Sequence, residues 1–370
     1  MLVQDPAARG PVPRHTRYLV DGLRRLGCTV VTHPWGSRSA DVGLLGTVAE
    51  RLGDVRSAAR EAARQPFDIG VVKTSHDWRT LARDLAVVAA MRRTRRPLVL
   101  QLHGSRAAAL VEPGHRAFKA ATAALLAMAD GVMVLSTEEQ RQWRAFRPEP
   151  PIFTVKNPYV RSFGATAAAD ETAASPPQLL FVGRLIEQKG VFDLAGAFPT
   201  VLERADCELV FAGDGPAEPE LKRKLASAGI ADRVRFAGYL AGADLTEAYR
   251  RATVFVLPSW SEGFPTVLAE AMDAGLPVVT TRIRGAADHL VDGENALFVA
   301  PRDVEGLAAA LTTLLEDPDR RARMARANRA RVDVFAPDVV AREYLDVLHA
   351  VLARADGRRA AADPTSPHLA

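Results

Sequence analysis

Short apolar runs alternate with helix-like patterns along almost the whole sequence. Runs of Val, Leu, Ile and Phe between turn residues predict buried strands, and the stretches of helical periodicity between them predict helices. Regular alternation of this kind is typical of parallel α/β architecture. In the first half the predicted strands are Leu2–Gln4, Thr29–Thr32, Ile69–Lys73, Leu98–Leu102, Val132–Leu135 and Ile152–Val155. Predicted helices between them include Thr16–Leu26, Trp78–Arg93 and Ala117–Ala129.

The pattern stops once and then starts again. Residues 161–177 are small and polar with two prolines, which predicts a linker. Beyond it the predicted strands are Leu179–Val182, Leu209–Ala212, Val234–Ala237, Val254–Leu257, Val278–Thr281 and Leu297–Val299. We therefore expect two doubly wound, Rossmann-like domains, 1–160 and 178–336, facing each other across a cleft. A helix is expected after Pro337, and the tail 357–370, rich in Ala, Pro and Ser, is predicted to be disordered.

Composition narrows the classes of partner. The 370 residues suit two domains, and a net charge of +4 with a pI near 9.2 permits anionic partners without requiring them. Only 6% of residues are aromatic and no basic–aromatic stripe occurs, which disfavours nucleic acid. Cys28 and Cys207 form no disulfide or metal pattern. With no signal peptide and no apolar run near ~18 residues, we expect a soluble protein of the cytoplasm.

The stretch Pro258–Pro277 places a helix start directly beyond a buried strand. Val254–Leu257 leads into a turn, and Thr266–Asp273 has helical spacing. Pro265 suits the first helical position, and Gly275 suits a left-handed cap. The free N–H groups at such a helix start attract anions, and the carboxylates of Glu262 and Glu270 bracket it. This arrangement predicts a site for an anion and its attached hydroxyls.

The string Glu262-Gly263-Phe264-Pro265, followed by Glu270-Ala271, closely resembles the signature of retaining glycosyltransferases of the GT-B fold, family 4. The resemblance covers most of the chain and is strongest from about 179 to 301. It implies transfer of a sugar from a UDP- or GDP-linked donor to an acceptor hydroxyl with retention of configuration. It also implies that helix 337–356 crosses back to the first domain. The alternative is a solvent-facing Glu270 and a Glu262 that caps a turn.

A second motif, Gly183 to Gly190 (GRLIEQKG), also follows a strand. Gly183 permits a sharp turn, and Arg184 and Lys189 supply two cations. Fixed cations stabilise the charge that develops on a leaving diphosphate, and removing one such group typically costs on the order of 10²–10³ in rate. The resemblance implies that Arg184 and Lys189 hold the donor diphosphate. The alternative is a surface loop in which they pair with Glu187 and Asp193.

The resemblance assigns roles to further residues of the second half. The backbone N–H groups of Thr266 and Val267 would bind the diphosphate, and Glu270 would accept hydrogen bonds from the ribose. Glu262, with the amides around Gly263 and Phe264, would hold sugar hydroxyls near the anomeric carbon. Backbone groups of Gly238, Tyr239 and Leu240 would meet the nucleobase. Gly213-Asp214-Gly215-Pro216 lacks a dinucleotide fingerprint and is either a tight turn or a donor contact.

In the first half the resemblance singles out His103-Gly104, at the end of a predicted strand. His103 would hydrogen-bond a sugar hydroxyl or a phosphate oxygen; the alternative is a histidine satisfied by a nearby loop carbonyl. The family usually begins with a full strand and a glycine-paired loop, whereas this chain has Met1–Gln4 and the single Gly10. Near Gly285, where the family often has a Glu, the matching residue is Asp288.

Weaker signals have simpler explanations. Asp317-Pro318-Asp319 is the only D-x-D string, and Asp319 is better explained as a helix N-cap, so no metal or other cofactor is expected. His76-Asp77 either faces an acceptor or caps the helix that starts at Trp78. The arginine-rich run 92–96 suits a helix end, with peripheral contact at the inner face of a membrane as the alternative.

The expected partners are a nucleotide-sugar donor and a glycan, lipid-linked or small-molecule acceptor. Three other functions remain open: an inverting GT-B transferase, a nucleotide-sugar epimerase, and a protein that binds nucleotide-sugars without catalysis. The missing dinucleotide fingerprint disfavours a nicotinamide dehydrogenase.

Overall fold

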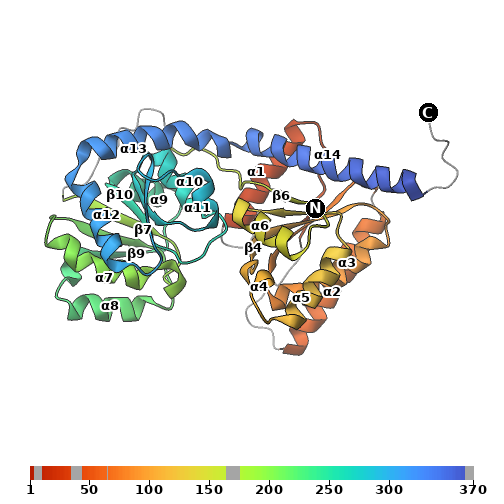
Figure 1. The fold of residues 1–370 in the computed structure, drawn as a ribbon, viewed down its shortest axis with the longest axis horizontal. Coiled ribbons are helices and arrows are strands. Elements are labelled where there is room, and N and C mark those ends of the chain that lie inside the picture. The colour runs from red at the N-terminus through yellow and green to blue at the C-terminus, as the bar shows by residue number, and fades with distance from the viewer. Residues whose placement is uncertain (4–10, 35–43, 65, 164–175, 363–370) are drawn as a thin grey trace. The chain divides into compact units, whose positions relative to one another are not determined.

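The computed structural model describes residues 1–3, 11–34, 44–64, 66–163 and 176–362. These residues form two compact units (Figure 1). Unit 1 comprises Met1–Pro158 and the chain from Pro337 onward, and unit 2 comprises Tyr159–Ala336. Each unit contains one six-stranded sheet whose strands are all parallel.

The sheet of unit 1 has the strand order β2-β1-β3-β4-β5-β6. Its strands are β1 (Leu2–Val3), β2 (His33–Pro34), β3 (Gly70–His76), β4 (Leu98–Ser105), β5 (Gly131–Val134) and β6 (Ile152–Thr154). Its helices are α1 (Pro11–Arg25), α2 (Leu44–Arg64), α3 (Trp78–Arg92), α4 (Ala108–Val111), α5 (Arg116–Ala127), α6 (Thr137–Phe146) and α14 (Pro337–Ala362).

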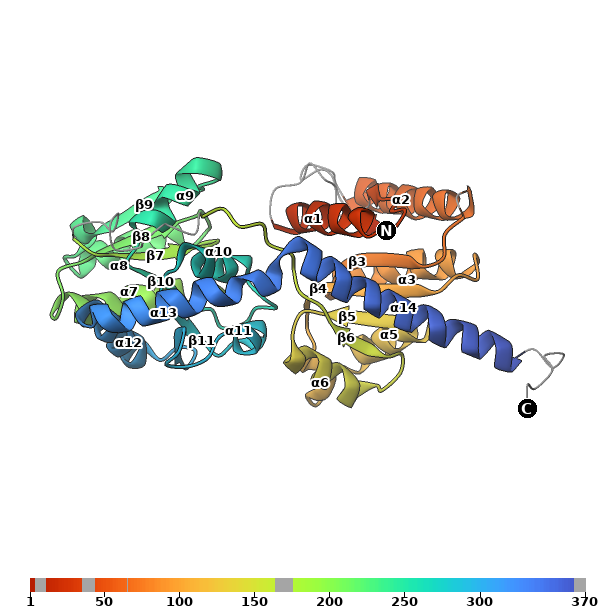
Figure 2. The same ribbon diagram turned by 90° about the horizontal axis from the view of Figure 1, so that it is seen from above.

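Apolar side chains cover both faces of this sheet because strand residues alternate between faces. In β4, Leu98 and Leu100 join a core cluster with side chains of α3 and α5, whereas Val99 joins a second cluster with α1 and α14. Figure 2 shows α14 running along the strands of unit 1. A Cβ atom at Gly22 of α1 would lie 2.7 Å from the Cβ atom of Ala341, so only glycine lets these helices approach so closely.

The sheet of unit 2 has the order β12-β11-β10-β7-β8-β9. Its strands are β7 (Gln178–Val182), β8 (Glu208–Ala212), β9 (Val234–Gly238), β10 (Val254–Leu257), β11 (Val278–Thr281) and β12 (Ala296–Val299). Its α-helices are α7 (Val191–Leu202), α8 (Glu218–Ser227), α9 (Gly242–Arg251), α10 (Thr266–Ala274), α11 (Arg284–His289), α12 (Val304–Glu316) and α13 (Pro318–Arg331). Short 3₁₀ turns are η1 (Glu187–Lys189), η2 (Ala231–Arg233) and η3 (Val332–Phe335). One core cluster fills this unit.

The prediction of two doubly wound α/β folds is thus confirmed, with two local corrections. The predicted strand Thr29–Thr32 is wrong: β2 is the pair His33–Pro34, and Val31 is exposed. Among the described residues, Leu2 of β1 pairs with His33 and Val3 pairs with Pro34. The prediction of a disordered chain from Gly357 is wrong as far as Ala362, because α14 continues through it. Arg358 anchors this extension through Asp130 (2.6 Å), and residues 363–370 lie outside the described residues.

The start of the expected linker belongs to unit 2. The backbone N–H groups of Ser162 and Phe163 donate to the carboxylate of Asp273 (2.7 and 3.1 Å), and Phe163 is buried. Residues 164–175, Gln4 and Gly10 lie outside the described residues. Among the described helices, none is both long and apolar enough to cross a membrane.

Candidate functional site

Three loops meet at the carboxyl edge of the sheet of unit 2, and backbone contacts hold two of them together. The loop after β7 and the loop after β8 exchange hydrogen bonds: Leu185 N–H donates to Asp214 O (2.7 Å) and Ala217 N–H donates to Leu185 O (3.0 Å). Cβ atoms at Gly213 and Gly215 would overlap the carbonyl groups of Gly183 and Leu185, respectively. Close packing of two loops therefore accounts for both glycines of the Gly213-Asp214-Gly215 turn.

The third loop, which follows β10, is attached to η1. The backbone N–H of Trp260 donates to Gln188 O (2.9 Å), and its indole N–H donates to the carboxylate of Asp193 (2.6 Å). Lys189 forms an ion pair with Glu262, which also accepts a hydrogen bond from the Ser259 hydroxyl (3.3 Å). The alternative in which Lys189 pairs with Glu187 or Asp193 is therefore wrong.

Arg184, the other cation of this edge, is exposed. Its backbone carbonyl accepts the N–H of Ile186 (2.9 Å), but within the described ranges its guanidinium makes no hydrogen bond or ion pair. The N–H donors of an exposed guanidinium can bind an anion from solution. At this edge Lys189 is thus paired, whereas the side chain of Arg184 is exposed to solvent.

Helix α10 begins beside these cations. Pro265 has an extended ψ of 122° and therefore occupies the N-cap position, one residue before the position predicted for it. Its fixed φ aims the chain into the helix, and the N–H groups of Thr266 and Val267 fall in the first turn, where a helix has no internal acceptors. Gly275 caps the other end with φ of 73°, as predicted.

Glu270 lies one turn along α10 and is only 6% exposed. The hydroxyl of Tyr249 donates to its Oε2 atom (2.9 Å). A glutamate on a solvated helix face would need no such donor, so the alternative of a solvent-facing Glu270 is wrong. A buried carboxylate with a tyrosine donor suits the recognition of hydroxyl groups.

Phe264 and Gly263 lie in the loop before α10 and are fixed there by a buried ring and a backbone hydrogen bond. The Phe264 ring is buried, stacked on Phe335 (4.8 Å) and edge-on to His289 (5.0 Å). The carbonyl of Gly263 accepts the N–H of Gly285 (2.8 Å) from the loop after β11. At the other side of the edge, Gly238 has φ of 67°, and the side chain of Tyr239 is 60% exposed, followed by the half-buried Leu240.

In unit 1, His103 lies near the carboxyl end of β4. Both ring nitrogens are buried without a hydrogen-bond partner among the described residues, so none of the described loop carbonyls satisfies this histidine. Burial, with the charges of Lys73 and His15 nearby, holds the pKa of His103 well below its usual value. Its imidazole is therefore uncharged at neutral pH and able both to donate and to accept.

Lys73 is a buried cation that sequence reasoning did not single out. It lies on β3, its ammonium group donates to the Thr16 hydroxyl (3.0 Å), and burial lowers its pKa to about 7. The sequence could have indicated Lys73, since it stands inside the apolar run of a strand. A charged group in such a place needs a partner or a function.

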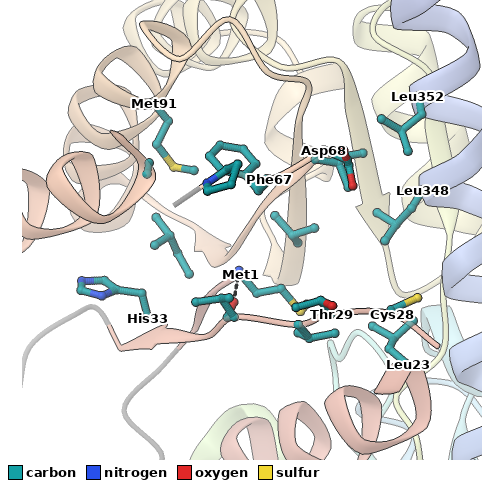
Figure 3. A pocket seen from close by; sticks show the side chains of 18 of the residues that line it. Met1, Leu23, Cys28, Thr29, His33, Phe67, Asp68, Met91, Leu348 and Leu352 are labelled. Atoms are coloured by element: carbon teal, nitrogen blue, oxygen red, sulfur yellow. Dashed lines mark hydrogen bonds between the residues drawn. The ribbon is translucent and has the colours of Figure 1, made fainter. Parts of the chain in front are cut away.

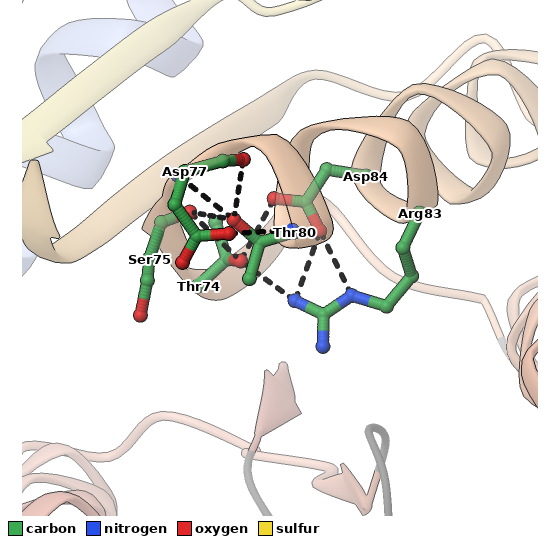
Figure 4. Close-up of polar contacts among 6 residues, drawn as sticks. All are labelled: Thr74, Ser75, Asp77, Thr80, Arg83 and Asp84. Atoms are coloured by element: carbon green, nitrogen blue, oxygen red, sulfur yellow. Dashed lines mark hydrogen bonds and ion pairs between the residues drawn. The ribbon is translucent and has the colours of Figure 1, made fainter. Parts of the chain in front are cut away.

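His76 and Asp77 end β3 and begin α3, and both have structural roles. Asp77 accepts the N–H of Thr80 (3.0 Å), which confirms that it caps the helix (Figure 4). The ring of His76 packs between Phe118 (4.6 Å) and Trp143 (4.7 Å), and burial lowers its pKa to about 4. A side chain enclosed in this way does not face an acceptor.

A polar network next to this cap fixes the first turns of α3 (Figure 4). Asp84 accepts hydrogen bonds from the Thr74 hydroxyl (2.8 Å) and from two nitrogens of Arg83 (3.0 and 3.1 Å). Its carboxylate is almost fully buried, and burial raises the pKa of Asp84 to about 6 despite these donors. The network ties the end of β3 to α3.

Unit 1 also has a cavity of about 490 Å³ at the opposite edge of its sheet. The cavity lies by the amino ends of β1 and β3, and mostly apolar side chains line it, including Phe67, Met91, Leu348 and Leu352 (Figure 3). Ligands of doubly wound sheets bind beyond the carboxyl ends of the strands. This cavity is therefore separate from the edge that carries His103.

The D-x-D string has a structural role, though not the predicted one. Asp317 is the N-cap of α13 and accepts the N–H of Arg320 (2.8 Å), so the prediction that Asp319 is the cap was wrong by two residues. Pro318 takes the first helical position, which places the capping carboxylate before it. In the described part of the chain, no group of three or more His, Cys, Asp or Glu side chains could hold a metal ion.

Two further residues support α10 and could not be recognised from the sequence. Tyr249 lies on α9, and its spacing indicates only a buried aromatic residue. Asp273 is the second carboxylate of α10: it accepts hydrogen bonds from Tyr159 (2.9 Å) and Arg161 (2.8 Å) as well as from two backbone groups. Its sequence neighbours gave no sign of partners more than a hundred residues away.

Comparison with known proteins places both units in one family. The family model "Glycosyl transferases group 1" matches residues 166–331, and "Glycosyltransferase Family 4" matches residues 12–160. D-inositol 3-phosphate glycosyltransferase of Acidothermus cellulolyticus is 34% identical over 329 residues, which cover 82% of this chain and 71% of that protein. Glycogen synthase of Mycobacterium tuberculosis is 38% identical over 166 residues, 45% of this chain and 40% of that protein. The matched stretch thus spans less than half the length of glycogen synthase.

Solved structures share the fold. Sucrose-phosphate synthase from Thermosynechococcus elongatus aligns with a TM-score of 0.77 at 20% identity, covering 95% of this chain and 98% of that one. Anabaena HepE in complex with UDP aligns with a TM-score of 0.70 at 18% identity, covering 94% and 98%. These likenesses agree with two Rossmann-like domains. The chain has the GT-B fold and belongs to the group 1 glycosyltransferases of family 4.

Proposed function

We propose that the protein transfers a sugar from a UDP- or GDP-linked donor to an acceptor hydroxyl with retention of anomeric configuration. The observation that supports this most is the set of groups at the carboxyl edge of unit 2. Exposed Arg184, the Lys189–Glu262 ion pair, the start of α10 and buried Glu270 all belong to that edge. Cations, helix N–H groups and a buried carboxylate match the parts of a nucleotide diphosphate.

Each group has a distinct task in the proposed reaction. Arg184, Lys189 and the N–H groups of Thr266 and Val267 bind the diphosphate and stabilise the negative charge that develops as the bond to the sugar breaks. Glu270 accepts hydrogen bonds from the ribose hydroxyls. Backbone groups of Gly238, Tyr239 and Leu240 meet the nucleobase.

Two side chains act on the sugar in this proposal. Glu262, with the amides around Gly263 and Phe264, binds sugar hydroxyls and stabilises positive charge near the anomeric carbon. His103, uncharged at neutral pH, exchanges a hydrogen bond with a sugar hydroxyl or a phosphate oxygen. Because two cations already act on the diphosphate, we expect turnover without a metal ion, and EDTA should leave the rate unchanged.

Related proteins support a nucleotide-sugar donor and are compatible with several classes of acceptor. HepE has been solved with UDP and with UDP-glucose. An α-D-kanosaminyltransferase and a lipopolysaccharide core glycosyltransferase are among the proteins that resemble this chain. We therefore propose a glycan, lipid-linked or small-molecule acceptor and a cytoplasmic protein that works in solution or at the inner face of a membrane.

A panel of UDP- and GDP-sugars, tested for donor hydrolysis and for transfer, examines the proposal. One donor should be hydrolysed slowly, and Glu270→Ala should abolish this activity while the circular dichroism spectrum stays unchanged. Full activity of Glu270→Ala would remove the site assignment. Binding of a nucleotide-sugar without hydrolysis or transfer would favour the non-catalytic alternative.

The stereochemistry needs its own measurement. Proton NMR of the product, taken early in the reaction, should show the anomeric configuration of the donor. The opposite configuration would identify an inverting transferase. Conversion of the donor into its epimer without an acceptor would identify an epimerase.

A further inference from the structure

Tyr249 of α9 connects that helix to the carboxylate of Glu270 on α10. Its side chain is 1% exposed, and its hydroxyl donates to Glu270 Oε2 (2.9 Å). The same hydroxyl lies 3.4 Å from the carbonyl oxygen of Val267 in the first turn of α10. One buried phenol group therefore contacts both the helix start assigned to the diphosphate and the glutamate assigned to the ribose.

The ring of Tyr249 cannot easily move. It lies edge-on to Phe163 (5.9 Å between centroids) and against Phe255 of β10 (5.8 Å). A ring fixed in a close-packed core holds its hydroxyl at one position. The terminal torsion of a glutamate, in contrast, has a broad energy profile, so its carboxylate plane needs an external group to define it.

We propose that Tyr249 is a positioning residue for Glu270: it fixes the plane of the carboxylate so that the protein selects nucleotides with an intact ribose. An ionised carboxylate has about four sites for hydrogen-bond donors, and the tyrosine occupies one of them in a defined direction. A fixed plane then sets the directions in which the carboxylate can accept hydrogen bonds from the 2′- and 3′-hydroxyls. This inference rests on the proposed donor site.

The same helix supplies a matched control. One turn beyond Glu270, Asp273 accepts a hydrogen bond from the buried hydroxyl of Tyr159 (2.9 Å). Asp273 also accepts two backbone N–H groups from residues 162 and 163, so its orientation does not depend on the tyrosine alone. Tyr159→Phe and Tyr249→Phe thus remove the same atom from the same kind of contact, one at Asp273 and the other at Glu270.

The test compares binding of four probes to the full chain by isothermal titration calorimetry: UDP, GDP, and the 2′-deoxy and 3′-deoxy forms of whichever binds more tightly. In the wild type, loss of one hydroxyl should weaken binding at least about 10-fold, since a charge-assisted hydrogen bond is lost. In Tyr249→Phe the parent nucleotide should bind about 10-fold more weakly, and the penalty for the missing hydroxyl should fall below about 3-fold. Tyr159→Phe should keep the wild-type penalty even if its melting temperature falls.

Turnover gives a second measurement. With the best nucleotide-sugar, Tyr249→Phe should raise KM for the donor several-fold and change kcat little, because Glu270 contacts a part of the donor that does not react. A merely structural tyrosine would lower the melting temperature and leave the deoxy penalty unchanged.

The outcomes separate the two proposals. An unchanged deoxy penalty in Tyr249→Phe, beside a wild type that discriminates, would overturn the role of Tyr249 and leave the donor site in place. A wild type that binds UDP or GDP but ignores both hydroxyls would overturn the role of Glu270 and of Tyr249 together. No binding of UDP or GDP to the wild type would overturn the proposed function itself.

Discussion

Lys189 and Glu262 are 73 residues apart in the sequence and form an ion pair at the carboxyl edge of unit 2. Their side chains are 21% and 17% exposed, so both charges are partly removed from water. We assign the lysine to the diphosphate and the glutamate to the transferred sugar. Without a ligand each group neutralises the other, and a bound diphosphate must draw Lys189 toward itself.

Replacing Lys189 should therefore cripple transfer. Lys189→Ala should lower kcat/KM for the donor by about 10²–10³, the typical effect of removing one group that stabilises transition-state charge. Lys189→Arg should have a kcat/KM between those of the wild type and Lys189→Ala, because the guanidinium keeps the charge with a different shape. Lys222→Ala on α8 is the control, since Lys222 forms an exposed pair with Glu218 (2.7 Å). Activity of Lys189→Ala within about threefold of the wild type would exclude the assigned role.

Replacing Gly190 should destabilise the protein more than replacing Gly229, which has a similar backbone conformation. Gly190 (φ of 69°) and Gly229 (φ of 71°) both adopt the left-handed conformation, which strains other residues. A Cβ atom at Gly190 would overlap the carbonyl of Pro258, whereas a Cβ atom at Gly229 would meet nothing within 4 Å. Gly190→Ala should thus lose about 2 kcal/mol more in free energy of unfolding than Gly229→Ala. Urea titrations of the two variants measure this difference, and equal losses would contradict the close approach of the two loops.

Asp273 should contribute strongly to the stability of unit 2. Its carboxylate is fully buried and accepts four hydrogen bonds from residues 159–163. Asp273→Ala leaves buried donors without an acceptor and should lower the free energy of unfolding by about 3–5 kcal/mol. Arg161 also pairs with Asp333, which is 67% exposed, so Asp333→Ala should cost less than about 1 kcal/mol. Similar melting temperatures for the two variants would count against this ranking.

Acid should destabilise unit 1 through its buried histidines. Burial lowers the pKa of His15 to about 3 and that of His76 to about 4, from 6.5 in the unfolded chain. At a pH between the folded-state and the unfolded-state pKa of a histidine, the unfolded state binds more protons than the folded state. The free energy of unfolding therefore falls as the pH decreases below 6.5. At pH 5 each histidine should account for a loss of about 2 kcal/mol relative to pH 7. The raised pKa of Asp84, about 6, acts in the opposite direction.

The variant His76→Gln tests this pH dependence. It removes one titrating group and keeps a polar side chain next to Thr122, whose hydroxyl lies 2.9 Å from His76 Nε2. Urea unfolding at pH 7 and pH 5, followed by circular dichroism, should show a smaller loss in the variant by about 2 kcal/mol. An equal loss in both proteins would show that His76 is not the group responsible.

The sequence was most informative where apolar runs lie between clear turn residues. Val254–Leu257 and Val278–Thr281 match β10 and β11 at both ends, and prolines mark two of these ends, since Pro258 follows β10 and Pro277 precedes β11. The helix cap at Gly275 and the cap at Asp77 followed from local chemistry in the same way. The repeated strand–helix pattern then required two parallel sheets.

Features that depend on distant partners could not be predicted. Thr29–Thr32 has strand-forming residues, but the residues that pair with Leu2 and Val3 are His33 and Pro34, and Thr29–Thr32 contributes only the Val31 carbonyl, which accepts from the Met1 amino group (2.6 Å). The extension of α14 past Gly357 depends on Asp130, more than two hundred residues away. Helix α6 is a different case: Ser136 accepts the N–H of Glu139 (3.1 Å), and the string Ser136-Thr137-Glu138-Glu139 is a local capping-box signal that the sequence analysis did not use.

The residues of the candidate site also divide into those that the sequence indicated and those that it did not. The sequence identified Arg184, Lys189, Glu262 and Glu270 because each stands in a motif beside a strand end. Tyr249, Trp260 and Lys73 were missed because their roles come from contacts between loops and helices, and an isolated aromatic or lysine has no distinctive spacing. Positioning residues of this kind need coordinates.

The most direct test is a crystal of the full chain soaked with UDP or GDP. The diphosphate should lie within hydrogen-bond distance of Lys189, Arg184 and the first N–H groups of α10, with the ribose hydroxyls on Glu270. A nucleotide bound away from these residues, for example in the cavity of unit 1, would contradict the proposed function.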